Sequence, residues 1–356
     1  MASIVDVARQ AGVSPATASR VLSGSSHAVS QATRARVHAV AEELDFVPNA
    51  LARGLLKSRA PIVGVIVHDI TDPYFGEIVR GVEDAAEASG YLVITCSSDR
   101  SAEREDSYVR LLRSMRAAAV LFAGSGIRGS GFEDQMARHL VAMERYGAAV
   151  VHLSPGHRGA AQVGVDNAGA MAAIVRGLIA LGHRRIGYLS GPEWLYVASD
   201  RDRGYRDALA DAGIAPDPRI VISTSFDIAG GMSGIDRLLA VEPRVTAVAC
   251  ANDLLALGAL DRLSELGVSV PGDISVSGFD DIPGASRTAP SLSTVRVPLR
   301  ELGSMGLEHA LKTLAGRRPH RRLLPYEVVL RGSTSAPRAR IERTATTAAP
   351  QEVAAR

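Results

Sequence analysis

The amino-acid sequence predicts an α/β protein, with an all-α head at the N-terminus and a two-lobed, doubly wound body of parallel sheets. Apolar residues recur at helical spacing in the first part of the chain. From Ile62 onward, short apolar runs alternate with helical stretches, as they do in parallel sheets covered by helices on both faces. The strands are too many for one ordinary sheet, so we expect two lobes with a cleft between them.

Two short helices joined by a tight turn are expected at the N-terminus. One face of the first helix is apolar and consists of Ile4, Val7, Ala8 and Ala11. Gly12 can adopt the left-handed backbone that ends a helix, and Ser14 and Pro15 are suited to begin the next one. This pattern is typical of a helix-turn-helix motif, although an amphipathic hairpin without a DNA-binding role would share it.

The outward face of the second helix is small or hydroxylated, with one arginine and no acid. It consists of Pro15, Ala16, Thr17, Ser19 and Arg20. Such a face suits a groove lined with phosphates. Ser30 can cap a third helix, whose apolar face is formed by Val37, Val40, Ala41 and Leu44.

Charge is distributed unevenly along the chain. Residues 1–59 carry seven Lys and Arg against four acidic residues, a net charge of +3, which leaves −1 for the rest of a chain whose total is +2. A basic head on a near-neutral body fits a nucleic-acid contact made by the head alone, although an excess of three can also arise by chance.

The body begins with a buried strand at Ile62–Val67 and a helix at Tyr74–Ser89. Further strands are expected at Leu92–Cys96, Ala118–Phe122, Ala149–Leu153, Val163–Asp166, Ile186–Ser190, Ile220–Ser223, Val245–Cys250 and Ile274–Phe279. The break between the lobes is expected near Pro155–Gly156. The G-x-G-x-x-G pattern at Gly124–Gly129 lacks the acid that a dinucleotide site needs at the end of the next strand, so we expect a flexible surface loop there.

Several chemical classes are disfavoured by composition. Cys96 and Cys250 lie far apart in apolar runs, which indicates buried free thiols in a reducing compartment. The sequence shows no metal-ligand cluster, no cofactor motif, no signal peptide and no apolar run long enough for a membrane span, so we expect a cytoplasmic protein without a metal or cofactor. Residues 336–356 have the composition of a disordered tail.

Four polar residues stand where predicted strands give way to loops or helices: Asp166, Arg201, Asn252 and Asp280. Parallel sheets bind ligands at the carboxyl ends of their strands. Carboxylate, amide and guanidinium groups together are good partners for vicinal hydroxyls. Each residue also has a simpler interpretation, since Asn252 and Asp166 could only cap the helices that follow them.

Taken together, these motifs resemble the lactose-repressor/galactose-repressor (LacI/GalR) family of bacterial transcription regulators. The matching residues are Asp6–Ala8, Ala11–Ser14, Thr17, Ser19–Val21, Val29–Ser30, Thr33–Arg34, Pro48–Asn49 and Ala52–Arg53. The resemblance implies a type I periplasmic-binding-protein-like body whose chain crosses between lobes three times, the later crossings falling near Pro283–Pro290 and Arg321–Pro325.

The resemblance also implies a division into domains. Residues 1–48 would form the DNA-binding head, 49–60 a hinge helix and linker, and 61–335 the effector-binding and dimerisation body. Within the body, the lobes would begin as about 61–156 and 157–285.

Roles in DNA binding follow from the same resemblance. Residues at phosphate-contacting or capping positions are Ser14, Thr17 and Ser19, and those at base-reading positions are Pro15, Ala16 and Arg20. Asn49 and Arg53 belong to a hinge segment that becomes helical only on DNA, and Leu55 matches the leucine that wedges into the minor groove. The expected partner is a pseudo-palindromic operator read by a homodimer.

For the effector, the resemblance assigns hydroxyl-holding positions to Asp166, Arg201, Asn252 and Asp280. Phe75 and Phe226 match aromatic positions that flank the effector ring, and the asparagine at position 252 favours a sugar over a purine. We therefore expect a repressor of a carbohydrate-utilisation operon and not an enzyme. The alternatives are a solute-binding protein, which the head and missing export signal oppose, and a sugar- or nucleotide-handling enzyme, for which no nucleophile motif is present.

Overall fold

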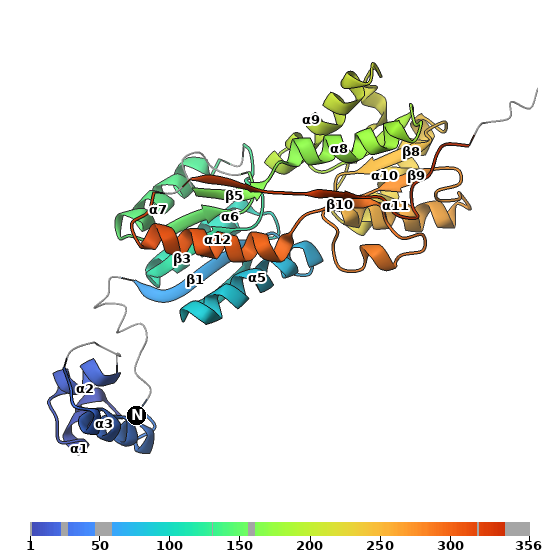
Figure 1. Ribbon diagram of the computed structural model, residues 1–356. Coiled ribbons are helices and arrows are strands. Elements are labelled where there is room, and N and C mark those ends of the chain that lie inside the picture. The colour runs from blue at the N-terminus through green and yellow to red at the C-terminus, as the bar shows by residue number, and fades with distance from the viewer. Residues whose placement is uncertain are drawn as a thin grey trace, which may run out of the picture. The chain divides into compact units, whose positions relative to one another are not determined.

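The computed structural model describes residues 2–22, 28–46, 59–129, 131–155, 161–318 and 320–338 (Figure 1). The chain divides into two compact units. Unit 1 comprises Met1–Asp166, Trp194–Val197 and Pro298–Pro325, and unit 2 comprises Asn167–Glu193, Ala198–Val297 and Tyr326–Arg356. The helical head, which is counted within unit 1, is described separately from the sheet that follows it.

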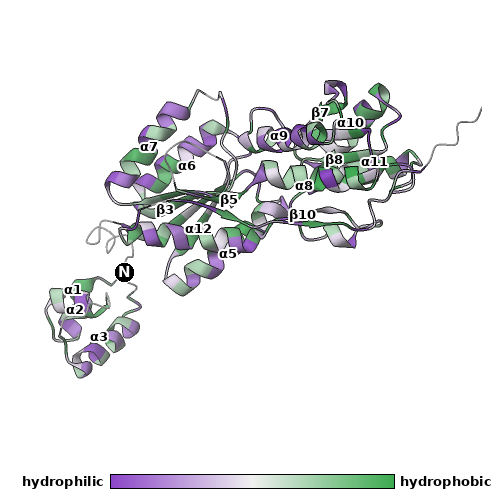
Figure 2. Ribbon diagram, turned by 45° about the horizontal axis from the view of Figure 1, so that its top comes forward, coloured by the Kyte–Doolittle hydropathy of each residue, from purple (hydrophilic) through white to green (hydrophobic). Residues whose placement is uncertain are grey.

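The head contains three helices, α1 (Ile4–Gln10), α2 (Pro15–Leu22) and α3 (Gln31–Glu43). Ser3 and Asp6 form a capping box at the start of α1, and Gly12 turns the chain with a φ of +62°. The apolar faces of the three helices meet in one core, built from Val7, Ala8, Ala11, Ala18, Val21, Val37, Val40 and Ala41. The three helices expected from sequence are confirmed, and Figure 2 shows their apolar sides turned toward one another.

Unit 1 contains a six-stranded parallel sheet with the order β11-β5-β4-β3-β1-β2. Its strands are β1 (Ala60–Val67), β2 (Leu92–Ser97), β3 (Ala117–Phe122), β4 (Ala149–His152), β5 (Ala161–Val165) and β11 (Arg321–Leu324). Helices cover both faces (Figure 1), and they are α5 (Pro73–Ser89), α6 (Ala102–Ser114), α7 (Glu133–Arg145) and α12 (Leu299–Leu314). α5 packs with α12, and α6 packs with α7.

Helices α5 and α12 touch along their backbones because each carries a glycine at the crossing. A Cβ atom on Gly81 of α5 would lie 2.0 Å from the carbonyl oxygen of Arg300, and one on Gly303 of α12 would lie 2.0 Å from that of Ile78. Both distances are far shorter than a carbon–oxygen contact, so neither position accommodates a side chain without separating the helices.

Unit 2 contains a four-stranded parallel sheet with the order β7-β6-β8-β9. Its strands are β6 (Ile186–Ser190), β7 (Val221–Ser223), β8 (Ala247–Cys250) and β9 (Ser275–Ser277). Its helices are α8 (Asn167–Ala180), α9 (Tyr196–Asp211), α10 (Ile228–Val241) and α11 (Asp253–Glu265). A separate antiparallel pair, β10 (Thr294–Arg296) and β12 (Glu327–Val329), lies at the two places where the chain leaves and re-enters unit 2.

The strands expected from sequence are confirmed, with ends that differ by at most two residues. The positions at which the chain passes from one unit to the other differ more from those expected. The chain first leaves unit 1 after Asp166 rather than near Pro155–Gly156, because β5 pairs with β4 in the unit 1 sheet. It leaves unit 2 after Val297 rather than near Pro283–Pro290, because the segment before it pairs as β10 with β12.

The segment expected to be a flexible surface loop at Gly124–Gly129 is instead held in place. Ile127 forms an antiparallel bridge with Leu195, and the buried Ser125 hydroxyl accepts a hydrogen bond of 3.1 Å from the amide of Val197. Cys96 is likewise only half-buried, whereas Cys250 is buried as expected, and both are free thiols. Among the described residues, no helix combines the length and apolar character required to cross a membrane.

Candidate DNA-contacting helix and effector site

The second helix of the head presents the expected face to solvent. The Ser14 hydroxyl accepts a 3.1 Å hydrogen bond from the amide of Thr17 and lies 2.8 Å from the Thr17 hydroxyl, so Ser14 caps α2. Pro15, Ala16 and Arg20 are exposed, whereas Thr17 and Ser19 are half-buried. The outward surface of α2 is therefore small, free of carboxylates and marked by one guanidinium, which suits entry into a DNA groove.

The orientation of α2 is fixed by contacts with its neighbours. The Arg36 guanidinium on α3 donates a 2.8 Å hydrogen bond to the carbonyl of Ala11, at the turn that joins α1 to α2. Another arginine of the head, Arg9, forms an ion pair with Asp6 of the same helix, α1. Asn49, Arg53 and Leu55, which the resemblance assigns to a DNA-bound hinge, lie outside the described residues.

A buried polar cluster at the carboxyl edge of the unit 2 sheet is centred on Arg201 of α9. Its Nη2 lies 3.0 Å from Oδ1 of Asp280, and their side chains are only 6% and 5% exposed. Its Nε donates to Oδ1 of Asn167 at 3.0 Å, and its Nη1 donates to the carbonyl of Ala251. The guanidinium carbon stands 3.7 Å from the ring centroid of Phe279. Arg201 is therefore held in one place by four neighbours.

The turn that carries Asp280 has an unusual backbone. Asp280 has a φ of 112° and Asp281 a φ of 55°, two consecutive non-glycine residues in a region that L-amino acids rarely adopt. Such conformations cost about 1–3 kcal/mol each and persist only where the surroundings fix them. The strain falls at the residue whose carboxylate meets Arg201.

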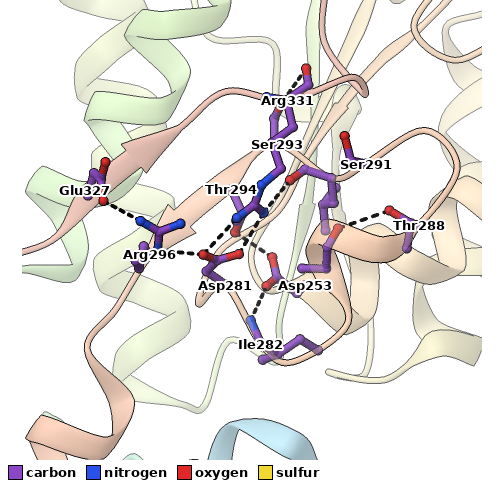
Figure 3. Close-up of polar contacts among 12 residues, drawn as sticks. Asp253, Asp281, Ile282, Thr288, Ser291, Ser293, Thr294, Arg296, Glu327 and Arg331 are labelled. Atoms are coloured by element: carbon purple, nitrogen blue, oxygen red, sulfur yellow. Dashed lines mark hydrogen bonds and ion pairs between the residues drawn. The ribbon is translucent and has the colours of Figure 1, made fainter.

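Asn252 and Asp253 begin helix α11 and have different environments. Oδ1 of Asn252 caps the helix by accepting a 2.9 Å hydrogen bond from the amide of Leu255, which leaves its carboxamide nitrogen able to donate to a ligand. Asp253 is fully buried, and its two carboxylate oxygens accept from the Thr294 hydroxyl at 2.6 Å and the Ile282 amide at 2.9 Å (Figure 3). Burial, and then the charge of Asp280, raise the pKa of Asp253 to about 8.

Phe226 lies at the same edge of the unit 2 sheet, after strand β7. Its ring packs on Gly191, the residue after β6, where a Cβ atom would lie only 2.1 Å from the tip of the ring. Only glycine allows this approach. Arg201, Asn252 and Asp280 thus stand beyond the carboxyl ends of parallel strands, as expected from sequence, and Phe226 stands beyond the end of β7.

The two remaining candidates, Phe75 and Asp166, belong to unit 1. Phe75 is buried in the first turn of α5 and meets the ring of His68 edge-on at 5.6 Å between centroids. Asp166 is exposed and directly precedes α8. Both stand after strand ends of the unit 1 sheet, β1 for Phe75 and β5 for Asp166.

His68 lies next to the buried carboxyl group of Glu105, a neighbour that the sequence did not reveal. Its Nε2 is 3.1 Å from the carbonyl of Ser125 and 3.6 Å from Oε1 of Glu105. Burial lowers the pKa of His68 to about 3, with a further contribution from Arg100, and burial raises the pKa of Glu105 to about 7. His68 is therefore neutral near neutral pH, so it donates to the carbonyl of Ser125 and forms no ion pair with Glu105.

Asn167 is a partner of Arg201 that the sequence did not reveal. It directly follows the candidate Asp166, and its Oδ1 accepts the hydrogen bond from Nε of Arg201. Asn167 and Arg201 are 34 positions apart in the sequence. Nothing in the sequence distinguished Asn167 from an ordinary residue in the first turn of a helix. Among the described residues, no three or more His, Cys, Asp or Glu side chains are grouped so that they could hold a metal ion.

Comparisons with known proteins agree with this architecture. Residues 3–49 match the family model for bacterial regulatory proteins of the lacI family, and residues 175–334 match a periplasmic binding protein-like domain. The HTH-type transcriptional regulator GalR of Escherichia coli K12 is 38% identical over 90% of this chain and 91% of its own length. The HTH-type transcriptional repressor CytR of the same organism is 34% identical over 94% of this chain and 97% of its own length.

Solved structures show the same similarity. The lac repressor dimer bound to operator and the anti-inducer ONPF has a TM-score of 0.82 and 28% identity, covering 94% of this chain and 99% of that one. The complex of the transcriptional regulator CelR with cellobiose has a TM-score of 0.69 and 29% identity, covering 94% and 100%. A helix-turn-helix head followed by a periplasmic-binding-protein-like body, matched along nearly the whole chain, is thus the common feature. The chain belongs to the LacI family of bacterial regulatory proteins and is a DNA-binding transcription regulator.

Proposed function

We propose that the chain acts as a homodimeric repressor of a carbohydrate-utilisation operon and that a sugar controls its affinity for a pseudo-palindromic operator. The observation that carries this proposal is the combination, in one chain, of a carboxylate-free exposed face on α2 and the buried Arg201–Asp280 pair at the carboxyl edge of a parallel sheet. The first feature suits a DNA groove, and the second suits vicinal hydroxyls.

In the DNA-bound state, α2 would enter the major groove. Arg20 would supply the strongest readout, because a guanidinium donates two hydrogen bonds to guanine O6 and N7. Pro15 and Ala16 offer only apolar contact, whereas Ser14, Thr17 and Ser19 would face phosphates. Hinge residues Asn49, Arg53 and Leu55 would complete the interface, with Leu55 opening the minor groove at the operator centre.

For the effector, we propose that hydroxyl groups are bound by Arg201, Asp280 and Asn252, with Asp166 as a further polar contact. Phe75 and Phe226 would flank the ring. A sugar is the favoured class because related proteins include a ribose operon repressor of Haemophilus influenzae, 32% identical over 92% of this chain, and the CelR–cellobiose complex.

Dimerisation is proposed to involve the β2 edge of the unit 1 sheet. At the opposite edge, β11 begins with two arginines, which discourage pairing with another sheet. Strand β2 carries no charge, and its Leu92 is 63% exposed, the largest exposed fraction among the large hydrophobic residues described. An exposed apolar edge of this kind is a natural surface for a second copy of the chain.

We further propose that the protein is cytoplasmic, where it can reach its operator, and that it has no enzymatic activity. The described carboxylate with the most raised pKa value, Asp253, would be the natural candidate for acid–base catalysis. Both of its oxygens are taken by Thr294 and Ile282 in the protein interior, so it is not accessible to a substrate.

The DNA-binding proposal is tested with sheared DNA from the source genome. It would be captured by the full-length protein and by a version lacking residues 1–59. We expect the full-length protein alone to enrich a short pseudo-palindrome, and genes next to it would suggest the sugar. Equal recovery of all sequences by the full-length protein, with and without added sugars, would contradict sequence-specific binding.

The effector proposal is tested with Arg201→Ala. Because Arg201 would contact the effector and not DNA, the variant should bind the operator normally while losing its response to sugar. Fluorescence anisotropy with a labelled operator would measure both properties. A normal sugar response in the variant would show that the effector binds elsewhere.

A further inference from the structure

The strained turn at Asp280–Asp281 needs external constraints. Besides the backbone hydrogen bonds that join Asp280 to Val295 and Val297, the structure contains one at Asp281. Asp281 lies beside Arg331, whose guanidinium forms a two-pronged contact with it (Figure 3). Nη1 lies 2.7 Å from Oδ1 of Asp281, and Nη2 lies 3.0 Å from Oδ2. Nη1 also donates to the carbonyl of Leu292 at 2.8 Å. The guanidinium therefore holds the carboxylate in both position and plane.

The ion pair between Arg331 and Asp281 is stabilised by its burial. The side chains of Arg331 and Asp281 are 14% and 10% exposed. Burial alone would raise the pKa of Asp281, but the hydrogen bonds from Arg331 and Arg296 outweigh it and leave that pKa below its ordinary value. The carboxylate is therefore ionised near neutral pH, and the ion pair is partly shielded from solvent.

Asp281 has a second arginine partner that offers a natural comparison. Nε of Arg296 donates to Oδ2 of Asp281 at 2.8 Å, and its Nη1 donates to Glu327 at 2.7 Å. The Arg296 side chain is 47% exposed and makes only one hydrogen bond to Asp281. An exposed contact of this kind constrains its partner less than a buried fork does.

The next residue of the turn is also restrained, since the amide of Ile282 donates to the buried Asp253. Arg201 therefore contacts the side chain of Asp280, while the two residues that follow Asp280 are held by other side chains. Rotation of the turn toward an ordinary backbone conformation would carry the Asp280 carboxylate away from Arg201.

We propose that Arg331 is a positioning residue for effector binding: by gripping Asp281, it keeps Asp280 directed at Arg201 without touching the effector itself. The proposal rests on the effector site proposed above. Arg331 reaches this site from the last passage of the chain through unit 2, 50 positions away from Asp281 in sequence.

The first test needs no effector. Hydrogen exchange is measured on full-length, sugar-free protein for wild type, Arg331→Gln and the control Arg296→Gln. We expect amides of residues 280–282 to exchange about tenfold faster in Arg331→Gln, the equivalent of roughly 1.4 kcal/mol, with α10 and α11 unchanged. The control should stay close to wild type. Unchanged protection of the turn, or faster exchange throughout unit 2, would overturn the proposal. If Arg331→Gln does not fold, Asp281→Asn weakens the same contact from the other side, together with the contact to Arg296, whose separate effect the Arg296→Gln control measures.

The second test uses titration calorimetry with D-galactose, D-ribose and cellobiose. For any of these sugars that wild type binds, Arg331→Gln should raise Kd about tenfold, and it should cause no further increase in an Asp280→Asn background. A residue that only supports the fold would weaken binding in both backgrounds. Sugar binding that survives Arg201→Ala refutes the effector site, whereas loss in Arg201→Ala with normal binding in Arg331→Gln refutes only the positioning role. If none of the three binds, hydrogen exchange alone decides.

Discussion

Individual side chains in this protein do different work depending on whether their partners are inside or outside the molecule. Three arginines donate hydrogen bonds to buried or half-buried carbonyl and carboxylate groups and thereby fix the local geometry: Arg201, Arg331 and Arg36. Arg20 instead lies exposed on α2, where a guanidinium can meet a base edge. We therefore expect Arg20 to contact DNA, whereas Arg201 would share its donors between the protein and the proposed effector.

Replacement of Arg20 by alanine should weaken operator binding by about 10- to 100-fold, because a two-pronged contact with guanine contributes roughly 1–3 kcal/mol. Binding to unrelated DNA should fall much less, so sequence discrimination declines. Anisotropy titrations with operator and scrambled duplexes at one salt concentration would measure both affinities. Arg9→Ala serves as the control, since Arg9 is paired with Asp6 on α1. An equal loss for both duplexes would assign Arg20 to phosphate contact.

Asp253 should make stability depend on pH. Its pKa in the folded chain is raised to about 8 from an ordinary value of 3.8, so between these values the folded chain retains a proton that the unfolded chain releases. The stabilisation is complete below about pH 4 and is lost as pH rises toward 8. Urea midpoints measured from pH 5 to 8 should therefore fall more steeply for wild type than for Asp253→Asn. Parallel curves would contradict a buried, protonated Asp253.

At the scale of elements, contacts between helices depend on positions where no side chain fits. Gly81→Ala would force a methyl group against the Arg300 carbonyl, where α5 crosses α12. We expect a loss of about 1–3 kcal/mol, measured by urea unfolding. Gly76→Ala, on the same helix with nothing within 4 Å of its added methyl, should be neutral or gain up to about 1 kcal/mol. Equal stability of the two variants would refute the backbone contact.

The same scale explains what could be predicted from sequence. Strands β1–β9 could be predicted because each contains a run of apolar residues. Arg201 and Asp280 could be chosen as candidates because they follow predicted strands. Strands β10, β11 and β12 were missed because each is short and includes a charged residue, so none of them forms an apolar run. Arg331 and Asn167 were missed for a different reason, since their roles depend on partners 50 and 34 positions away.

At the scale of the whole molecule, the proposed dimer lets two heads bind two half-sites together, so loss of pairing should cost operator affinity even with both heads intact. Leu92→Lys on β2 should raise the dimer dissociation constant at least about tenfold, because a charge at an apolar edge must be desolvated for pairing. Analytical ultracentrifugation would measure this. Leu111→Lys, which changes another exposed leucine on α6, is the control. Unaltered dimerisation of Leu92→Lys would place the interface elsewhere.

The arrangement around Arg201 also bears on how tightly the proposed effector site could hold a sugar. Each of the three guanidinium nitrogens of Arg201 already donates a hydrogen bond, to Asp280, Asn167 or Ala251, so an arriving hydroxyl would in part replace or share bonds that exist. Exchange of one hydrogen bond for another yields little net free energy. Release would then be rapid, and occupancy would rise and fall with the concentration of free sugar. Such a protein is suited to sensing a sugar that is abundant and poorly suited to binding a sugar present at very low concentration.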